Sequence, residues 1–142
     1  NLGFTLLELI IIIVIMGIFA FVVTIKFPGT SVNLKAQTEQ LTNDIRYTQN
    51  LSMARNQHYR LVIPSPTTYE VQNAVGTTDY SVTLGSGIAS IAGDTIIFNS
   101  KGVPYSDDST PLASVQTFVL TNSGGETASA SITPTPGRVT TS

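Results

Sequence analysis

The chain has 142 residues and a formal net charge of −2, and only 11% of its residues are charged. This weak charge argues against a general binder of nucleic acid or of anionic membranes, which needs a clear basic excess. The sequence contains no cysteine, which excludes a disulfide, a thiolate metal site and a cysteine nucleophile within it.

The first predicted element is a long apolar helix. No residue from Leu9 to Ile25 is charged, and Lys26 ends the run. With Phe4 to Leu7 included, the segment is long enough to cross a bilayer, which takes about 20 helical residues. Glu8 lies within this segment, where an unpaired carboxylate costs several kcal/mol, so it indicates a functional site in which the carboxylate has a partner. The alternative is that Glu8 lies at the headgroup boundary, where the positive N-terminal end of the helix dipole stabilises a carboxylate.

The order Gly3-Phe4-Thr5-Leu6-Leu7-Glu8 before this run resembles the processing site of type IV pilins and of type II secretion pseudopilins. The resemblance implies that a prepilin peptidase cuts after Gly3, that Phe4 becomes the methylated N-terminal residue, and that residues 1–3 are residual leader peptide. It also implies that Glu8 of one subunit neutralises the Phe4 amine of a neighbour in the apolar core of a filament. Two charges that are costly to bury alone are tolerable as a pair, and the pairing sets the register between subunits.

Two positions weaken the helix over residues 4–28, the expected membrane and filament-core segment. Gly17 costs about 1 kcal/mol relative to alanine and Pro28 about 3 kcal/mol, and the pair Pro28-Gly29 predicts a kink. By resemblance to pilin filaments, we expect the helix to unwind locally between Gly17 and Pro28 on assembly. A simple bend is the alternative.

Residues 29–57 form the second predicted helix, which is amphipathic and carries two apolar stripes. We expect one stripe to pack on the chain's own domain and the other to face neighbouring subunits; the alternative is one wide buried face. The first stripe consists of Leu34, Leu41 and Ile45 with the small residues Thr38, Thr48 and Ser52, and the second of Ala36, Tyr47, Leu51, Ala54 and His58.

From residue 58 onward the hydrophobic period changes from helical to extended. Residues 58–63 and 68–72 are expected to form a hairpin, with Pro64-Ser65-Pro66 ending its first strand. Further strands are expected at 81–84, 95–98, 115–120 and 128–132, and the short connections favour an antiparallel meander.

The predicted fold class is therefore α+β. A long N-terminal helix, with a membrane half, an amphipathic half and a kink near Pro28, packs on an antiparallel β-sheet in a globular domain at residues 58–142. This is the pilin fold that the resemblance implies. Residues 44–57, 96–104 and 131–139 also resemble segments of the GspH/FimT-type minor pseudopilins, and we expect Arg138 to tie the tail to a carboxylate or carbonyl of the sheet.

Few residues suggest other chemistry. Asp107 and Asp108 are candidate Ca²⁺ ligands, although adjacent acids are more often a solvated turn, and we expect no other cofactor. Lys101 and Arg138 are the candidate nucleic-acid contacts, but two cations are a weak phosphate footprint and we do not expect DNA binding. His58 continues a helical stripe, which favours a packing or capping role over catalysis.

We predict a non-enzymatic structural subunit of a type IV pilus or a type II secretion pseudopilus. By resemblance, its partners are other copies of itself, other pilins or pseudopilins, the prepilin peptidase and the assembly platform. It would span the bacterial inner membrane once, with the β-domain outside the cytoplasm, and then enter a periplasmic pseudopilus or an extracellular pilus. The alternatives are a monomeric signal-anchored periplasmic binding domain and a minor tip pilin with a role in DNA uptake. An anchored hydrolase is disfavoured, because the sequence clusters no catalytic set.

Overall fold

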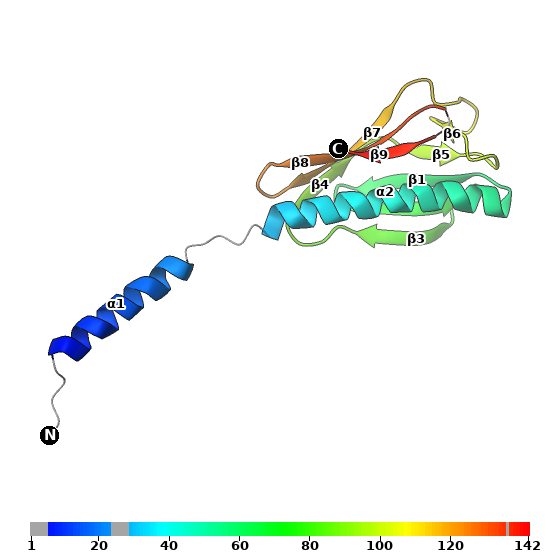
Figure 1. The fold of residues 1–142 in the computed structure, drawn as a ribbon. Coiled ribbons are helices and arrows are strands. Elements are labelled where there is room, and N and C mark those ends of the chain that lie inside the picture. The colour runs from blue at the N-terminus through cyan, green and yellow to red at the C-terminus, as the bar shows by residue number, and fades with distance from the viewer. Residues whose placement is uncertain (1–5, 24–28, 136) are drawn as a thin grey trace.

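The computed structural model describes residues 6–23, 29–135 and 137–142. Helix α1 (Leu6–Val23) lies apart from a domain in which helix α2 (Gly29–Arg55) packs against two antiparallel sheets (Figure 1). The α+β class predicted from the sequence is confirmed. The kink expected at Pro28 falls outside the described residues.

Helix α2 ends two residues before the expected boundary because its last turn closes on an asparagine. Asn56 adopts a left-handed conformation with φ of 51°, which a short polar side chain tolerates better than a bulky one. The Gln57 amide then donates to the Ser52 carbonyl at 3.2 Å, which satisfies one of the free carbonyls at the helix end. The chain leaves this cap directly into the first strand.

The first sheet has the strand order β3-β2-β1-β5-β6. Strands β1 (Tyr59–Ser65) and β2 (Thr68–Asn73) form the expected hairpin, with Leu61 opposite Val71. Strand β1 continues through Pro64, where the sequence predicted its end. The register shifts between Val62 and Ser65, and such an irregularity accommodates a proline that has no amide hydrogen to donate. The other strands are β3 (Thr78–Thr83), β5 (Ile96–Phe98) and β6 (Pro104–Tyr105).

The second sheet has the strand order β4-β7-β8-β9, so the expectation of one continuous meander is wrong. Its strands are β4 (Ile88–Ala92), β7 (Gln116–Asn122), β8 (Thr127–Ile132) and β9 (Val139–Thr141). Strands β4, β6 and β9 were not expected, because they are short and two of them lie beside glycine or proline. The antiparallel pairing itself is confirmed at every strand pair that the structure describes.

The hydrophobic core lies between α2 and the two sheets. The face of α2 that points inward is lined by Leu34, Leu41 and Ile45, each at most 4% exposed. Three buried threonines also lie on the helix, and each hydroxyl donates to the carbonyl four residues earlier, for example Thr38 to Leu34 at 2.8 Å. These local bonds satisfy the hydroxyls, so the helix brings short side chains close to the sheets without burying an unpaired donor. The largest fully buried partners from the sheets are Tyr59, Tyr69, Phe98, Phe118, Leu61, Ile96, Leu120, Ile132 and Val71.

Candidate assembly surfaces

Helix α1 exposes an apolar surface. Every described side chain from Leu6 to Met16 is exposed, from 43% at Ile12 to 79% at Leu6. Glu8 lies in the first turn, where the positive end of the helix dipole stabilises a carboxylate. Contiguous apolar surface of this kind marks a site of interaction with another protein or with a membrane.

The other residues predicted around this helix are only partly described. Gly3, Phe4 and Pro28 lie outside the described residues. Gly17 lies within α1, and Gly29 is the first residue of α2. Across the described ranges, no helix is both long and apolar enough to cross a membrane.

The outer face of α2 carries most of the second predicted stripe. Tyr47 is 50% exposed, and Ala36 and Ala54 are exposed as well. Leu51 is half-buried and packs against the core. The two stripes therefore differ in environment, because the first lies in the core and the second lies at the surface and along one edge of the helix.

A cleft formed by tyrosine and aspartate side chains lies between α2 and strand β3. Asp44 and Tyr47 of α2 and Asp79 and Tyr80 of β3 line a cavity of about 310 Å³. We call it the tyrosine–aspartate cleft. Tyr80, like Tyr47, keeps much of its ring exposed, at 40%.

Two buried tyrosines fix the carboxylates of this cleft from below. The Tyr69 hydroxyl donates to Asp44 Oδ2 at 2.6 Å, and the Tyr59 hydroxyl donates to Asp79 Oδ2 at 3.0 Å. Four of the five tyrosines in the chain therefore surround these two acids.

Burial controls the electrostatics of the cleft. Desolvation raises the pKa of Asp44 above its usual value, and the hydrogen bond from Tyr69 opposes this rise. Desolvation and the hydrogen bond to Asp44 raise the pKa of Tyr69, and desolvation and the hydrogen bond to Asp79 raise the pKa of Tyr59. Both tyrosines thus remain protonated donors, and they hold the carboxylates in place.

On the other flank of α2, three distant segments meet around two glycines. Gly102 and Gly137 both have φ of 75°, a conformation that glycine adopts without strain. Gln49 Nε2 of α2 donates to the Gly102 carbonyl at 2.7 Å. A Cβ atom added at Gly137 would lie 3.3 Å from that same carbonyl oxygen. This contact, which we call the glycine junction, joins the three segments that resemble minor pseudopilins: 44–57, 96–104 and 131–139.

The two predicted basic residues lie beside the glycine junction. Lys101 precedes Gly102 and Arg138 follows Gly137, and both side chains are exposed. The expectation that the Arg138 side chain ties down the tail is wrong. Its backbone pairs with Thr133, while the guanidinium of Arg46 on α2 donates to the Val139 carbonyl at 2.9 Å. Arg46 ties the last strand to the helix, because it faces β9 across the edge of the sheet.

The candidate calcium ligands are engaged in local structure. Asp107 Oδ1 accepts hydrogen bonds from the amides of Ser109 and Thr110, and these bonds lower the pKa of Asp107 from 3.8 to about 2. Asp108 Oδ1 lies 3.3 Å from Arg60 Nη2. In the part of the chain that the structure describes, no three His, Cys, Asp or Glu side chains come together to hold a metal ion.

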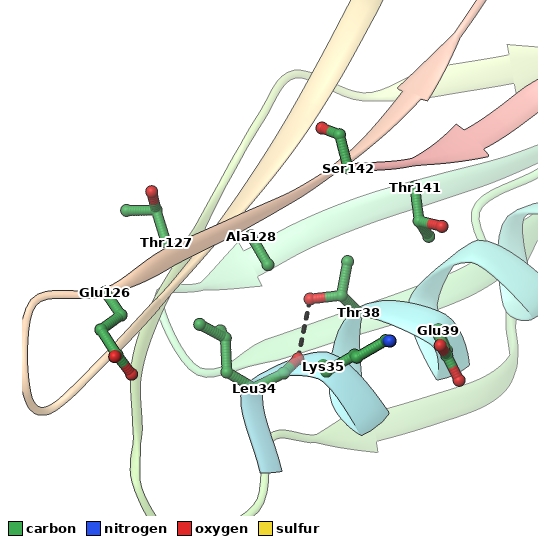
Figure 2. Close-up of a pocket in the computed structure, with 9 residues that line it drawn as sticks. All are labelled: Leu34, Lys35, Thr38, Glu39, Glu126, Thr127, Ala128, Thr141 and Ser142. Atoms are coloured by element: carbon green, nitrogen blue, oxygen red, sulfur yellow. Dashed lines mark hydrogen bonds between the residues drawn. The ribbon is translucent and has the colours of Figure 1, made fainter. Parts of the chain in front are cut away.

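A larger groove lies between the first turns of α2 and the end of the second sheet. Its volume is about 530 Å³, and the helix contributes Leu34, Lys35, Thr38 and Glu39 (Figure 2). The facing residues are Glu126, Thr127, Ala128, Thr141 and Ser142. His58 lies elsewhere, half-buried with its ring 6.3 Å from that of Tyr105, in agreement with a packing role.

The domain is similar to a solved structure, that of the type IV minor pilin FimU from Pseudomonas aeruginosa strain PAO1. The TM-score is 0.62 at 14% sequence identity, and the similarity covers 81% of this chain and 92% of that one. The chain has the type IV pilin fold. No protein-family model and no curated protein sequence matches it. Within this pilin fold, the tyrosine–aspartate cleft and the glycine junction occupy opposite flanks of α2.

Proposed function

We propose that this chain is a non-enzymatic structural subunit of a type IV pilus or of a type II secretion pseudopilus, and that it polymerises through its N-terminal helix. One combination supports the proposal: a pilin-fold domain is preceded by a helix with exposed apolar side chains. Ten large hydrophobic side chains from Leu6 to Met16 are exposed. Covering them would contribute on the order of 10 kcal/mol or more per subunit, before the costs of association.

Glu8 then supplies the specificity of assembly. After cleavage behind Gly3, the amine of Phe4 carries a positive charge, and Glu8 of a neighbouring subunit neutralises it within the apolar core. Removing one partner leaves the other charge buried and uncompensated, which is more costly than removing both. Before assembly, we place residues 4–28 in the inner membrane, and on assembly the segment between Gly17 and Pro28 unwinds locally.

The test is electron microscopy of sheared surface filaments, with mass spectrometry of the N-terminal peptide. Cells carry the full chain, its Glu8→Ala variant or a matched control, Glu39→Ala, which removes an exposed acid from α2. We expect filaments of a chain that begins at methylated Phe4, lost with Glu8→Ala and kept with Glu39→Ala. An unprocessed monomer that is indifferent to Glu8 would refute the proposal and leave the anchored periplasmic binding domain. Processed chain present only in traces would assign the subunit to a minor position.

A minor tip subunit with a role in DNA uptake is the second candidate, because Lys101 and Arg138 lie beside the same glycine contact. Its test is a gel-shift titration of the full chain in detergent with double-stranded DNA. Loss of binding in both Lys101→Ala and Arg138→Ala, with a steep salt dependence, would support this role. Absence of binding at low salt would exclude it.

A further inference from the structure

The tyrosine–aspartate cleft has the chemistry of a binding site for a cationic side chain. Asp44 and Asp79 supply two carboxylates, each held at one oxygen by a buried tyrosine hydroxyl. Tyr47 and Tyr80 supply two partly exposed rings at the same cavity. Ring faces attract a guanidinium or an ammonium, and fixed carboxylates accept hydrogen bonds from it, so the two groups of residues favour the same ligand.

No Lys or Arg side chain of the described residues lines this cleft. Arg46 and Arg60 donate to backbone carbonyls elsewhere, and Arg60 also pairs with Asp108. Lys35 lines the separate groove at the start of α2. Arg55 is near enough to Tyr59 to oppose the rise of its pKa, but it is not among the residues that line the cleft.

Two basic side chains remain available on the opposite flank of the helix. Lys101 and Arg138 are exposed, and within the described ranges neither side chain makes a hydrogen bond or an ion pair. Successive residues of a helix are rotated by about 100°, so Tyr47 beside the cleft and Gln49 at the glycine junction point about 200° apart. Figure 1 shows β3 and β9 on opposite sides of α2, in accord with this separation.

We propose that the Lys101–Arg138 pair of one subunit binds in the tyrosine–aspartate cleft of the next copy. The proposal rests on the proposed filament function. The contact is heterologous, because one flank of a subunit meets the other flank of its neighbour. Repeated heterologous contacts that do not close into a ring produce an open helical assembly. Charge complementarity would orient the β-domains around the core that the N-terminal helices form.

Disulfide cross-linking tests this contact directly, because the sequence contains no cysteine of its own. Full-length chains carrying Tyr80→Cys and Arg138→Cys together are assembled into filaments in cells, oxidised and separated without reductant. A heterologous contact links each subunit to two neighbours, so we expect a ladder of multimers. Each single variant is expected to remain monomeric. The matched control is Asp94→Cys with Arg138→Cys, because Asp94 is exposed and lies outside the cleft.

The outcomes separate this inference from the function on which it rests. A ladder from the Tyr80–Arg138 pair and none from the Asp94 control would support the contact. Filaments that form normally but give no ladder would overturn the contact and leave the filament function intact. A wild-type chain that forms no filament would refute the proposed function itself.

A charge exchange gives a second readout that needs no cysteine. Arg138→Glu changes an exposed side chain that has no hydrogen bond or ion pair with another described residue, and we expect roughly a tenfold loss of filaments at low salt. Asp79→Lys alone should have a similar effect, and the double variant should restore assembly. A cooperative melting transition of each monomer variant would show that the domain still folds, including Asp79→Lys, which loses the hydrogen bond from Tyr59. Independent losses without restoration would contradict the pairing, and loss of DNA binding with normal filaments would assign the basic pair to DNA instead.

Discussion

The hydrogen bond between Tyr69 and Asp44 permits a quantitative prediction. Tyr69→Phe removes one oxygen from a ring that is only 1% exposed, so the packing is retained. The variant loses a 2.6 Å bond to a half-buried carboxylate. A hydrogen bond to a charged group contributes about 1.5–3 kcal/mol, and the partial exposure of Asp44 places the expected loss at about 1–2 kcal/mol. For a domain of this size, such a loss lowers the melting temperature by about 4–10 °C.

The pH dependence of the stability lost in Tyr69→Phe shows whether the loss comes from the hydrogen bond to the Asp44 carboxylate. Burial raises the pKa of folded Asp44, so the stability linked to its protonation is present at low pH and is lost as pH rises through the raised pKa. Without the Tyr69 hydroxyl, the hydrogen bond that opposes this rise is lost, and the pKa of Asp44 rises further. The deficit of Tyr69→Phe should therefore be larger at pH 7 than at pH 3.

The assay is urea denaturation of the full chain in detergent micelles, followed by circular dichroism, at pH 3, 5 and 7. Tyr105→Phe is the matched control, because no hydrogen bond of the Tyr105 hydroxyl occurs in the described part of the chain, and its cost should stay below about 0.5 kcal/mol. A cost for Tyr69→Phe equal to that of the control, or a cost that does not change with pH, would refute this account of the cleft.

Three further predictions concern the domain. Leu41→Ala removes a fully buried side chain of α2 and should cost about 2–5 kcal/mol of unfolding free energy in the same urea assay, whereas Ala54→Ser on the exposed face should be nearly neutral. Gly137→Ala introduces a Cβ at φ of 75° beside Gly102, and the backbone strain should lower the free energy of unfolding by roughly 1–3 kcal/mol in the same urea assay; an unchanged free energy would contradict the glycine junction. Hydrogen bonds lower the pKa of Asp107 to about 2, so its carboxylate stabilises the fold above about pH 4, and this stability is lost as pH falls toward 2. In Asp107→Ala, the free energy of unfolding should therefore depend less on pH between 4 and 2.

Local sequence patterns were enough to predict the helices and the longer strands of the hairpins. The inward stripe of α2 was readable because Leu34, Leu41 and Ile45 recur at helical spacing. The β1–β2 hairpin was readable because alternating apolar residues flank a proline-rich turn. By contrast, β4, β6 and β9 have two to five residues each, too few to show a period, and they exist because they pair with longer strands.

The two flanks of α2 show what sequence could not supply. Asp44 and Tyr47 are three residues apart on one helix turn, and Asp79 and Tyr80 are adjacent, yet nothing local indicates that these pairs meet. The sequence signal is an aspartate close to a tyrosine, which marks each pair but does not indicate that the two pairs face each other. Asp107 and Asp108 had the stronger local signal, and the structure uses them in a turn and an ion pair.

The sequence by itself determined that an apolar helix with one early acid precedes an amphipathic helix and a β-rich domain, because these features depend on periodicity and composition within short windows. Only the tertiary structure decided that the strands divide into two sheets, that Gly102 and Gly137 meet, and that four tyrosines surround two aspartates. Each of these depends on contacts between residues far apart in the chain. Such contacts form when the whole core packs, and no single segment encodes them.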